Sequence, residues 1–386
     1  ANLAVQEFHS DCLSRMEAEA QEVYAKAREA AHKCNSEIAL VGILPTLTKN
    51  NLGLDSMVPI PRYHALNKAF MELRGHDLQF TINGIDQLIV KHDNLMVEAC
   101  NTSFQVHFQV SPKDFARLYN IAQVVTGPLL AAAVNSPILL GKRLWHETRI
   151  SVFEYSVDAR STTHQARGLK PRVHFGNHWV DKSVTEIFKE DIARFRVLLT
   201  TETEDDPLAM VAQGIAPKLK ALCLHNGTVY RWNRACYGVH DGIPHLRIEN
   251  RVIPSGPTVI DEIANTAFFV GMMAGMSEKY DDIRDQITFQ DVKANFMAAA
   301  RAGIRAQMNW FGDTHMPARK LILDELLPVA ESGLQKYGVN QKDIDKYLGV
   351  LRDRVSTRRN GARWALESLD EMHEQGPEVQ RMRCLV

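Results

Sequence analysis

No pair among the six cysteines of this 386-residue sequence has the spacing of a zinc site or a redox motif. A chain of this length can bury a core without disulfides, so the cysteines are expected to be reduced and mostly structural. A glycine-rich phosphate loop, a Gly-x-Ser-x-Gly nucleophile turn and a His-Glu-x-x-His metal pair are also missing. P-loop, Rossmann, serine-hydrolase and zinc-protease sites therefore receive no support.

Neither sign of charge dominates, since 45 basic and 46 acidic residues give a formal net charge of −1. This balance gives no electrostatic reason to expect nucleic acid or an anionic membrane as a partner. The most apolar run, residues 263–276, contains Asn265 and Thr266 and is too short to span a bilayer, and no signal peptide opens the sequence. We expect a cytoplasmic protein that acts on small molecules through local sites.

Residues 245–253 form the most distinctive stretch of the sequence. If Leu246 and Ile248 face a core from a strand, the two-residue period places four polar residues together on the opposite face: His245, Arg247, Glu249 and Arg251. A carboxylate between arginines suits Mg²⁺ and the phosphates of a nucleotide, because carboxylates bind Mg²⁺ and Arg binds phosphate oxygens in pairs. A solvated, salt-bridged strand face is the alternative.

Two further candidates lie on segments with strand-like alternation. Residues 103–110 alternate apolar and polar side chains and place His107 at the centre of the polar face. Residues 146–154 also alternate, with Arg149 on the polar side. Side chains on neighbouring strands can converge in one groove. Two alternatives stay open: a hydrogen-bonded histidine, and an arginine paired with Glu147 or Glu154.

The remaining patterns predict one α+β domain over residues 1–386, with strands in the first two thirds and a helical C-terminal third. Residues 37–44 are predicted as a buried strand, Asn226-Gly227 as a hairpin turn and residues 155–176 as a mobile polar loop or lid. Helical periodicity predicts helices over residues 8–33, 65–74, 114–125, 129–134, 183–199, 259–276, 289–310, 317–337, 341–355 and 359–372.

Seven short motifs occur in an order and spacing that resemble glutamate–cysteine ligase family 2, the carboxylate–amine ligases. The resemblance covers about residues 41–364. The motifs are Gly42-Ile-Leu-Pro-Thr46, Pro61-Arg-Tyr63, Gln105-Val-His107, Asn135-Ser-Pro137, Thr148-Arg149, Ile248-Glu-Asn-Arg251 and Asn360-Gly-Ala-Arg-Trp364.

The resemblance implies a glutamine-synthetase-like fold, whose curved antiparallel sheet holds Mg²⁺ and ATP on its concave face. It implies activation of a carboxylate, typically the γ-carboxylate of glutamate, as an acyl phosphate that an amine such as cysteine attacks, as in glutathione biosynthesis. Glu249 and His107 match the family's metal ligands. Arg251, together with Arg247 on the same face, is expected at the nucleotide phosphates, and Arg149 at the carboxylate substrate or the transferring phosphoryl group.

One departure from the family pattern concerns the metal site. The family's first strand carries a Glu-x-Glu pair, and another Glu follows on a later strand, but nothing in residues 1–8 matches that strand. We expect either an upstream acidic segment that completes the site, or a non-catalytic nucleotide-binding or regulatory module that retains the fold. A further module after residue 386 is a related expectation.

Overall fold

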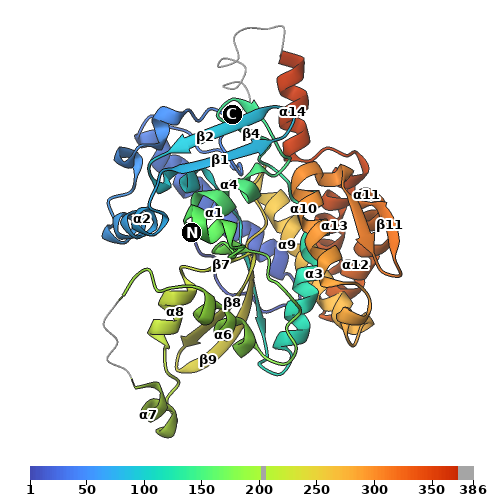
Figure 1. Cartoon of the computed structure of the whole chain (residues 1–386). Coiled ribbons are helices and arrows are strands. Elements are labelled where there is room, and N and C mark those ends of the chain that lie inside the picture. The colour runs from blue at the N-terminus through green and yellow to red at the C-terminus, as the bar shows by residue number, and fades with distance from the viewer. Residues whose placement is uncertain (201–205, 373–386) are drawn as a thin grey trace.

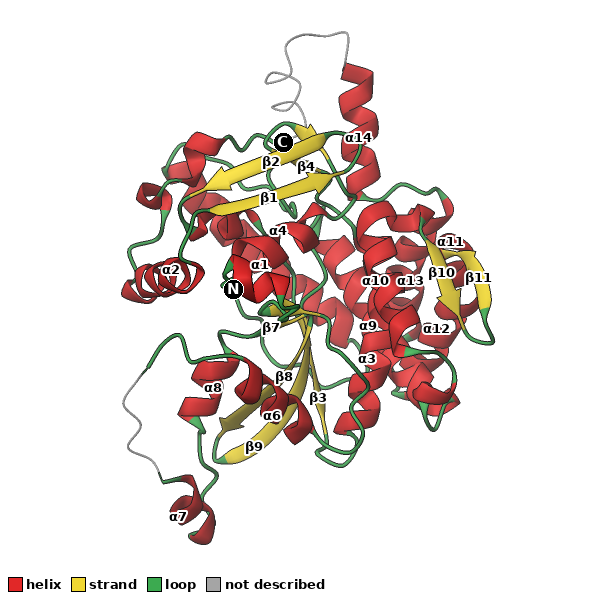
Figure 2. Ribbon diagram, in the orientation of Figure 1, coloured by secondary structure: helices red, strands yellow, loops and turns green. Residues whose placement is uncertain are grey.

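Helices and short sheets, antiparallel except for the β6–β7 pair, alternate in the first two thirds of the chain, and helices dominate the last third (Figures 1 and 2). The computed structural model describes residues 1–200 and 206–372. The helices are α1 (Cys12–Lys33), α2 (Pro61–Arg74), α3 (Phe115–Ala133), α4 (Thr148–Ser156), α5 (Thr162–Ala166), α6 (Val184–Arg194), α7 (Pro207–Ala212), α8 (Lys220–Asn226), α9 (Val259–Lys279), α10 (Phe289–Ala302), α11 (Ala318–Leu321), α12 (Leu327–Lys336), α13 (Gln341–Ser356) and α14 (Gly361–Glu371). The strands are β1 (Leu78–Asn83), β2 (Gln87–His92), β3 (Val106–Val110), β4 (Ile138–Leu139), β5 (Lys142–Arg143), β6 (Val173–His174), β7 (Tyr230–Arg231), β8 (Asn233–His240), β9 (Ile243–Asn250), β10 (Gln307–Trp310) and β11 (Thr314–Pro317). The predicted α+β class is confirmed.

The central sheet has three antiparallel strands in the order β3-β9-β8 (Figure 2). The strands β8 and β9 form a hairpin across Asp241 and Gly242, whose φ angles of 47° and 76° suit a two-residue turn. On one face of β9, Ile248 is fully buried and Leu246 is nearly so. The strand predicted around residues 245–253 is therefore confirmed, with its apolar face in the core.

A helical layer packs beside this sheet and contains the longest buried helix, α9 (Figure 1). The helix α9 is long and apolar enough to cross a membrane, but 89% of its most apolar window is buried inside the protein, so it is a core helix. Gly271 and Gly275 on α9 lie against α12, where Gly333 faces them, and the absent side chains let the two backbones approach closely.

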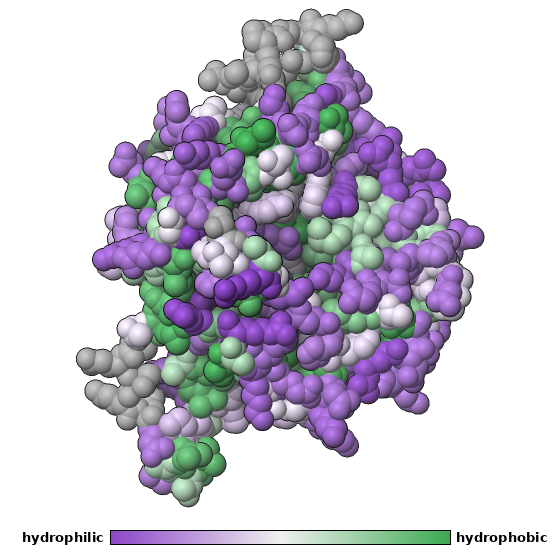
Figure 3. Space-filling view, viewed as in Figure 1, coloured by the Kyte–Doolittle hydropathy of each residue, from purple (hydrophilic) through white to green (hydrophobic). Residues whose placement is uncertain are grey.

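A second, smaller hydrophobic cluster lies under the β1–β2 hairpin, at the top of Figure 1. Phe80 and Ile82 on β1 and Val90 on β2 alternate with exposed residues and bury one face of the hairpin. At the opposite end, α7 projects at the lower left of Figure 1, and Figure 3 shows an apolar surface there. Leu208 and Val211 supply it, with 82% and 61% of their surface exposed.

Three predicted elements are wrong. Residues 146–154 form α4 and not a strand; Arg149 and Ser151 are buried like their apolar neighbours, so the alternation did not mark a solvated face. Asn226 and Gly227 end α8 instead of turning a hairpin, and Gly227 has an ordinary negative φ of −68°. Residues 37–44 contain no strand, although Gly42 bonds to two neighbouring segments. The two helices predicted over residues 114–134 are one helix, α3, which continues through Pro128.

The remaining helices agree with prediction apart from their ends and one interruption. The helix predicted over residues 289–310 ends at Ala302, and the hairpin β10–β11 follows. The helix predicted over residues 317–337 is divided by a π-helical turn, Ile322–Leu326. The predicted loop 155–176 includes the short helix α5 and the strand β6.

Candidate active site

The polar face of the central sheet brings together side chains from three strands. In the strand register, His107 on β3 and Arg234 on β8 lie on either side of Glu249 on β9. Cys236 pairs with Arg247 two positions along the same hairpin. The structure therefore joins three of the predicted site residues, His107, Arg247 and Glu249, on one surface, and Arg251 follows at the end of β9.

Glu249 is the centre of an ion-pair cluster. Its side chain has no exposed surface, and its Oε2 accepts hydrogen bonds from Arg234 Nε at 2.7 Å and from the Cys236 thiol at 3.2 Å. Arg251 Nε lies 3.2 Å from Oε1. Burial acts to raise the pKa of Glu249, but Arg234 and Arg251 outweigh burial and the pKa is lowered. Glu249 is therefore ionised at neutral pH.

Arg251 and Arg247 hold buried N–H groups for which the described residues supply no acceptor. The Arg251 guanidinium lies 5.8 Å from the ring centroids of both Phe153 and Tyr230. Within residues 1–200 and 206–372, no acceptor reaches the buried Arg251 Nη1 or the buried Arg247 Nε. A buried donor without a partner costs free energy, so both groups are suited to receive oxygen atoms of a ligand.

The net charge of this face is positive, because Arg234, Arg247 and Arg251 surround one carboxylate. The imidazole of His107 adds no charge to the face at neutral pH, because desolvation lowers its pKa and the nearby arginines lower it further against the effect of Glu249. An anion with several oxygen atoms, such as a phosphate chain, suits this charge and these donors.

The same face carries three possible metal ligands. His107, Cys236 and Glu249 offer ligand atoms that all lie within 4.8 Å of one another. Mg²⁺ takes oxygen ligands, however, and the face offers a single carboxylate, whose Oε2 is hydrogen-bonded to Arg234 and whose Oε1 lies 3.2 Å from Arg251 Nε without a hydrogen bond. Burial raises the pKa of the Cys236 thiol to about 11, so the sulfur carries its proton at neutral pH. The described residues do not by themselves fit Mg²⁺.

A comparison with family models decides the family. The model of glutamate-cysteine ligase family 2 matches residues 5–382, nearly the whole sequence. The chain belongs to this family. No protein with a curated description matches the sequence.

Two solved structures share a distant likeness with this family member. The Pup ligase PafA of the prokaryotic ubiquitin-like modification pathway, in complex with ADP, has 9% identity and a TM-score of 0.39, over 98% of this chain and 64% of that one. The complex of Pup with its ligase PafA has 8% identity and a TM-score of 0.34, over 84% of this chain and 67% of that one. The chain thus spans less than two thirds of the length of the first structure.

In this family member, Arg149 does not lie on the sheet. It sits near the start of α4, is 2% exposed and donates from Nε to Glu147 at 3.0 Å. Its Nη2 donates to the carbonyl oxygen of Val252, directly after Arg251. The predicted position on a strand is wrong, and of the two alternative ion pairs, with Glu147 or with Glu154, the structure has the one with Glu147. The guanidinium supports the backbone beneath the site.

Sequence reasoning missed Arg234 and Cys236. Residues 233–237 alternate these two polar side chains with Ala235 and Tyr237, which is a strand signal. The turn signal of Asn226-Gly227 lies shortly before β8 and competes with the turn signal of Asp241-Gly242, where β8 and β9 form their hairpin.

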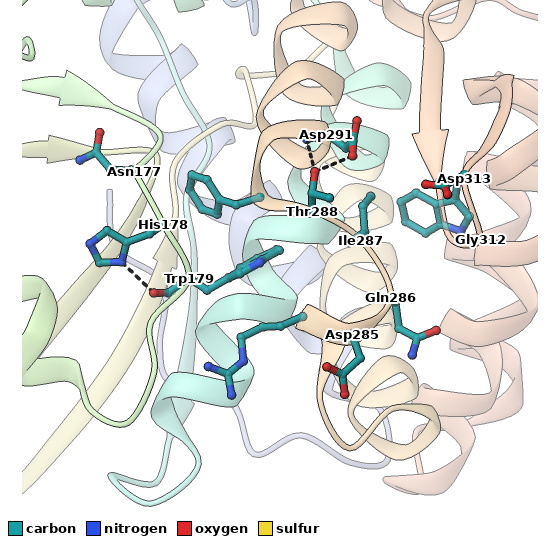
Figure 4. A pocket seen from close by; sticks show the side chains of 13 residues that line it. Asn177, His178, Trp179, Asp285, Gln286, Ile287, Thr288, Asp291, Gly312 and Asp313 are labelled. Carbon is teal, nitrogen blue, oxygen red and sulfur yellow. Dashed lines mark hydrogen bonds between the residues drawn. The ribbon is translucent and has the colours of Figure 1, made fainter.

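A surface pocket of about 490 Å³ lies elsewhere, beside the start of α10 (Figure 4). Trp179 packs edge to face on Phe289, with ring centroids 5.1 Å apart. Thr288 donates to Asp291 at 2.5 Å, and the His178 ring bonds to the Trp179 carbonyl oxygen at 2.8 Å, as the dashed lines show. These polar groups serve the local fold, so the sheet face remains the better candidate.

Proposed function

We propose that this chain carries the catalytic face of an ATP-dependent carboxylate–amine ligase. The observation that supports it most is the set of unpartnered Arg251 and Arg247 N–H groups on a positively charged sheet face, in a chain of glutamate-cysteine ligase family 2. ATP would transfer its terminal phosphoryl group to a carboxylate and leave as ADP. An amine would then attack the acyl phosphate, forming an amide and releasing phosphate.

The proposed reaction needs no protein nucleophile, and each residue of the face has a separate role in binding or positioning. Phosphoryl transfer needs positioning and charge neutralisation, which arginine pairs supply. Arg251 and Arg247 would bind phosphate oxygens, and Glu249 would hold Arg234 and Arg251 at the correct separation. Arg149, which bonds to the backbone after Arg251, would position this end of β9. Its predicted direct contact with the substrate or the phosphoryl group remains a prediction.

Mg²⁺ remains an expectation of the proposal. When bound with the nucleotide, it would neutralise phosphate charge. The described donors near His107 and Glu249 include one carboxylate that is already ion-paired, and no step above depends on the ion. The nature of the acid and amine also remains open to test, with glutamate and cysteine as the first choices.

The finer expectations about the protein follow from the family and not from the geometry. The three-stranded sheet would correspond to the curved sheet of a glutamine-synthetase-like fold. A cytoplasmic enzyme of glutathione biosynthesis, with one domain over residues 1–386 and small-molecule substrates, remains the prediction.

A second function is favoured by one observation, the single and fully ion-paired carboxylate of the face. A module that binds nucleotide through its arginines without turnover would need no further acidic ligands. It predicts ATP binding and no release of ADP with any amine.

The experiment that separates these functions is an assay of ADP release with Mg-ATP and glutamate, run without amine and then with a panel that includes cysteine. The ligase predicts amine-dependent release, and Arg251→Ala should lower kcat by about 100-fold or more, as expected when a donor to developing charge is removed. Arg352→Ala, on the exposed side of α13, is the matched control and should keep full activity. Full activity of Arg251→Ala would contradict the assignment of this face.

A further inference from the structure

Few polar contacts restrain the guanidinium of Arg251. Its Nε lies 3.2 Å from Glu249 Oε1, and 16% of the side chain is exposed. Within residues 1–200 and 206–372, neither Nε nor Nη1 has a hydrogen-bond partner. An arginine side chain is long and loses much rotamer freedom when it is fixed, so one ion pair does not set the direction of its N–H groups.

Two aromatic rings supply further restraint. The Arg251 guanidinium carbon lies over the rings of Phe153 on α4 and Tyr230 on β7, 5.8 Å from each ring centroid. The two ring centroids are 5.2 Å apart, and the ring planes meet at 60°. The guanidinium and the two rings therefore form a nearly equilateral triangle, in which both rings are close enough to attract the charge.

The contact with the rings leaves the N–H groups of the arginine available. A ring attracts the delocalised positive charge of a guanidinium, whereas a hydrogen bond or an ion pair occupies individual N–H groups. Phe153 is 8% exposed, and such attraction is stronger where water is excluded. The rings can thus hold Arg251 in place while its unpartnered Nη1 stays free for a ligand.

The two rings are themselves fixed by the surrounding structure. Phe153 packs edge to face on Trp232, with ring centroids 5.6 Å apart, and Trp232 is 1% exposed. Tyr230 lies on β7, where its backbone N donates to the Arg172 carbonyl oxygen at 2.9 Å. The triangle is therefore built on a packed helix and on a paired strand.

Helix α4 contacts Arg251 and its backbone at two points. Arg149 and Phe153 are four residues apart and so lie on the same side of the helix. Arg149 Nη2 donates to the carbonyl oxygen of Val252, and the Phe153 ring lies at the Arg251 guanidinium. One helix thus restrains both the backbone and the charged end of this residue.

We propose that Phe153 and Tyr230 are positioning residues that hold the free N–H groups of Arg251 toward a bound phosphate. The inference rests on the proposed function, because it requires Arg251 to bind phosphate oxygens. Both residues lie outside the seven family motifs. A guanidinium that is already fixed loses less freedom when the ligand binds, so the rings increase the affinity for ATP.

The test measures the dissociation constant of ATP for the full chain by calorimetry, without acid or amine. Phe153→Leu and Tyr230→Leu should each raise this constant about 10-fold, because each removes one ring and keeps an apolar side chain. Tyr230→Phe keeps the ring and should bind ATP like the wild type. Phe296→Leu is the matched control, since Phe296 also packs on Trp232 at 5.6 Å but is not one of the two rings over Arg251.

A double-mutant cycle determines whether the rings act through the arginine. In the Arg251→Ala background, Phe153→Leu should cause no further rise in the dissociation constant. A second 10-fold rise in that background would contradict the proposal. Urea denaturation without ligand completes the cycle, and the losses of stability from the two substitutions should be less than additive.

The other outcomes separate the positioning role from the proposed function. If the folded Phe153→Leu and Tyr230→Leu proteins bind ATP normally and Arg251→Ala does not, the positioning role alone is overturned. An equal loss of affinity in Phe296→Leu would assign the effect to general packing of the core and would also overturn it. Absence of ATP binding by the wild type would overturn the proposed function, and the positioning role with it.

Discussion

At the scale of single residues, Arg234 is the cation that does most to lower the pKa of Glu249 against the effect of burial. It makes the shortest contact in the cluster, 2.6 Å from Nη2 to Oε2, and Glu249 has no access to water. Arg234→Ala would leave a buried carboxylate with one cation fewer, so we expect the free energy of unfolding to fall by about 3 kcal/mol. Urea denaturation of the wild-type and variant chains measures this difference, and Arg352→Ala should show almost none.

The difference in unfolding free energy between wild type and Arg234→Ala should depend on pH, which gives an independent check on the ion pair between Arg234 and Glu249. The pKa of Glu249 is lowered in the folded protein from its ordinary value of 4.5, so the stabilisation is present above pH 4.5 and is lost as the pH falls through the folded value. The gap between wild type and Arg234→Ala should therefore be full at pH 7 and shrink under acid. A gap that stayed constant would indicate a packing effect of the Arg234 side chain.

At the scale of elements, the contact between α9 and α12 depends on glycine. A Cβ at Gly275 would overlap the Val329 carbonyl oxygen and come within 2.8 Å of Val329 Cγ1. Gly275→Ala should therefore lower the free energy of unfolding by about 2 kcal/mol, since overpacking displaces backbone.

Gly349 on α13 is the matched control for this prediction, because a Cβ there would meet no atom within 4 Å. Gly349→Ala should stabilise by roughly 0.5 kcal/mol or more through helix propensity alone. Thermal unfolding of both variants distinguishes overpacking from helix propensity. Equal shifts in unfolding temperature would show that the close contact between α9 and α12 tolerates a side chain at Gly275.

Elements also show where sequence patterns succeed and fail. The alternation around Glu249 predicted β9 because one face is buried and the other carries charge. The alternation around Arg149 is similar, but in α4 the polar positions are buried as well as the apolar ones. The buried guanidinium of Arg149 is satisfied by its ion pair with Glu147. Period alone cannot distinguish a solvated polar position from a buried ion pair.

At the same scale, the parts of the site that sequence could not supply depend on long-range packing. Arg149 reaches the end of β9 because α4 in one segment lies beside it, so that Arg149 Nη2 donates to the Val252 carbonyl oxygen. Arg234 required the correct hairpin, and Asn226-Gly227 offered a competing turn signal. Local patterns therefore found the strand at the centre of the face and missed its neighbours.

At the scale of the whole molecule, ligand binding should stabilise the entire fold through the positive face. ATP that binds only the folded chain adds about 2.7 kcal/mol at 100 times its dissociation constant. Because the arginines outnumber the carboxylate, we expect ATP to raise the unfolding temperature even without Mg²⁺, and a chelator to leave the ligand-free protein unchanged. Thermal scans with ATP, Mg-ATP and chelator test this. A shift that required Mg²⁺ would argue for a metal bound by the protein itself.

The register of the central sheet also has a consequence for how the protein is made. Arg234 and Glu249 lie on one hairpin and can meet early, but His107 pairs with Glu249 from a strand that leaves the ribosome long before. While α3 to α8 are synthesised, β3 has no partner strand and its alternating Phe and Val side chains have no completed core. Pairing across such a separation is slow, and an exposed strand invites contact with other chains. During that interval a chaperone that covers β3 would prevent such contacts.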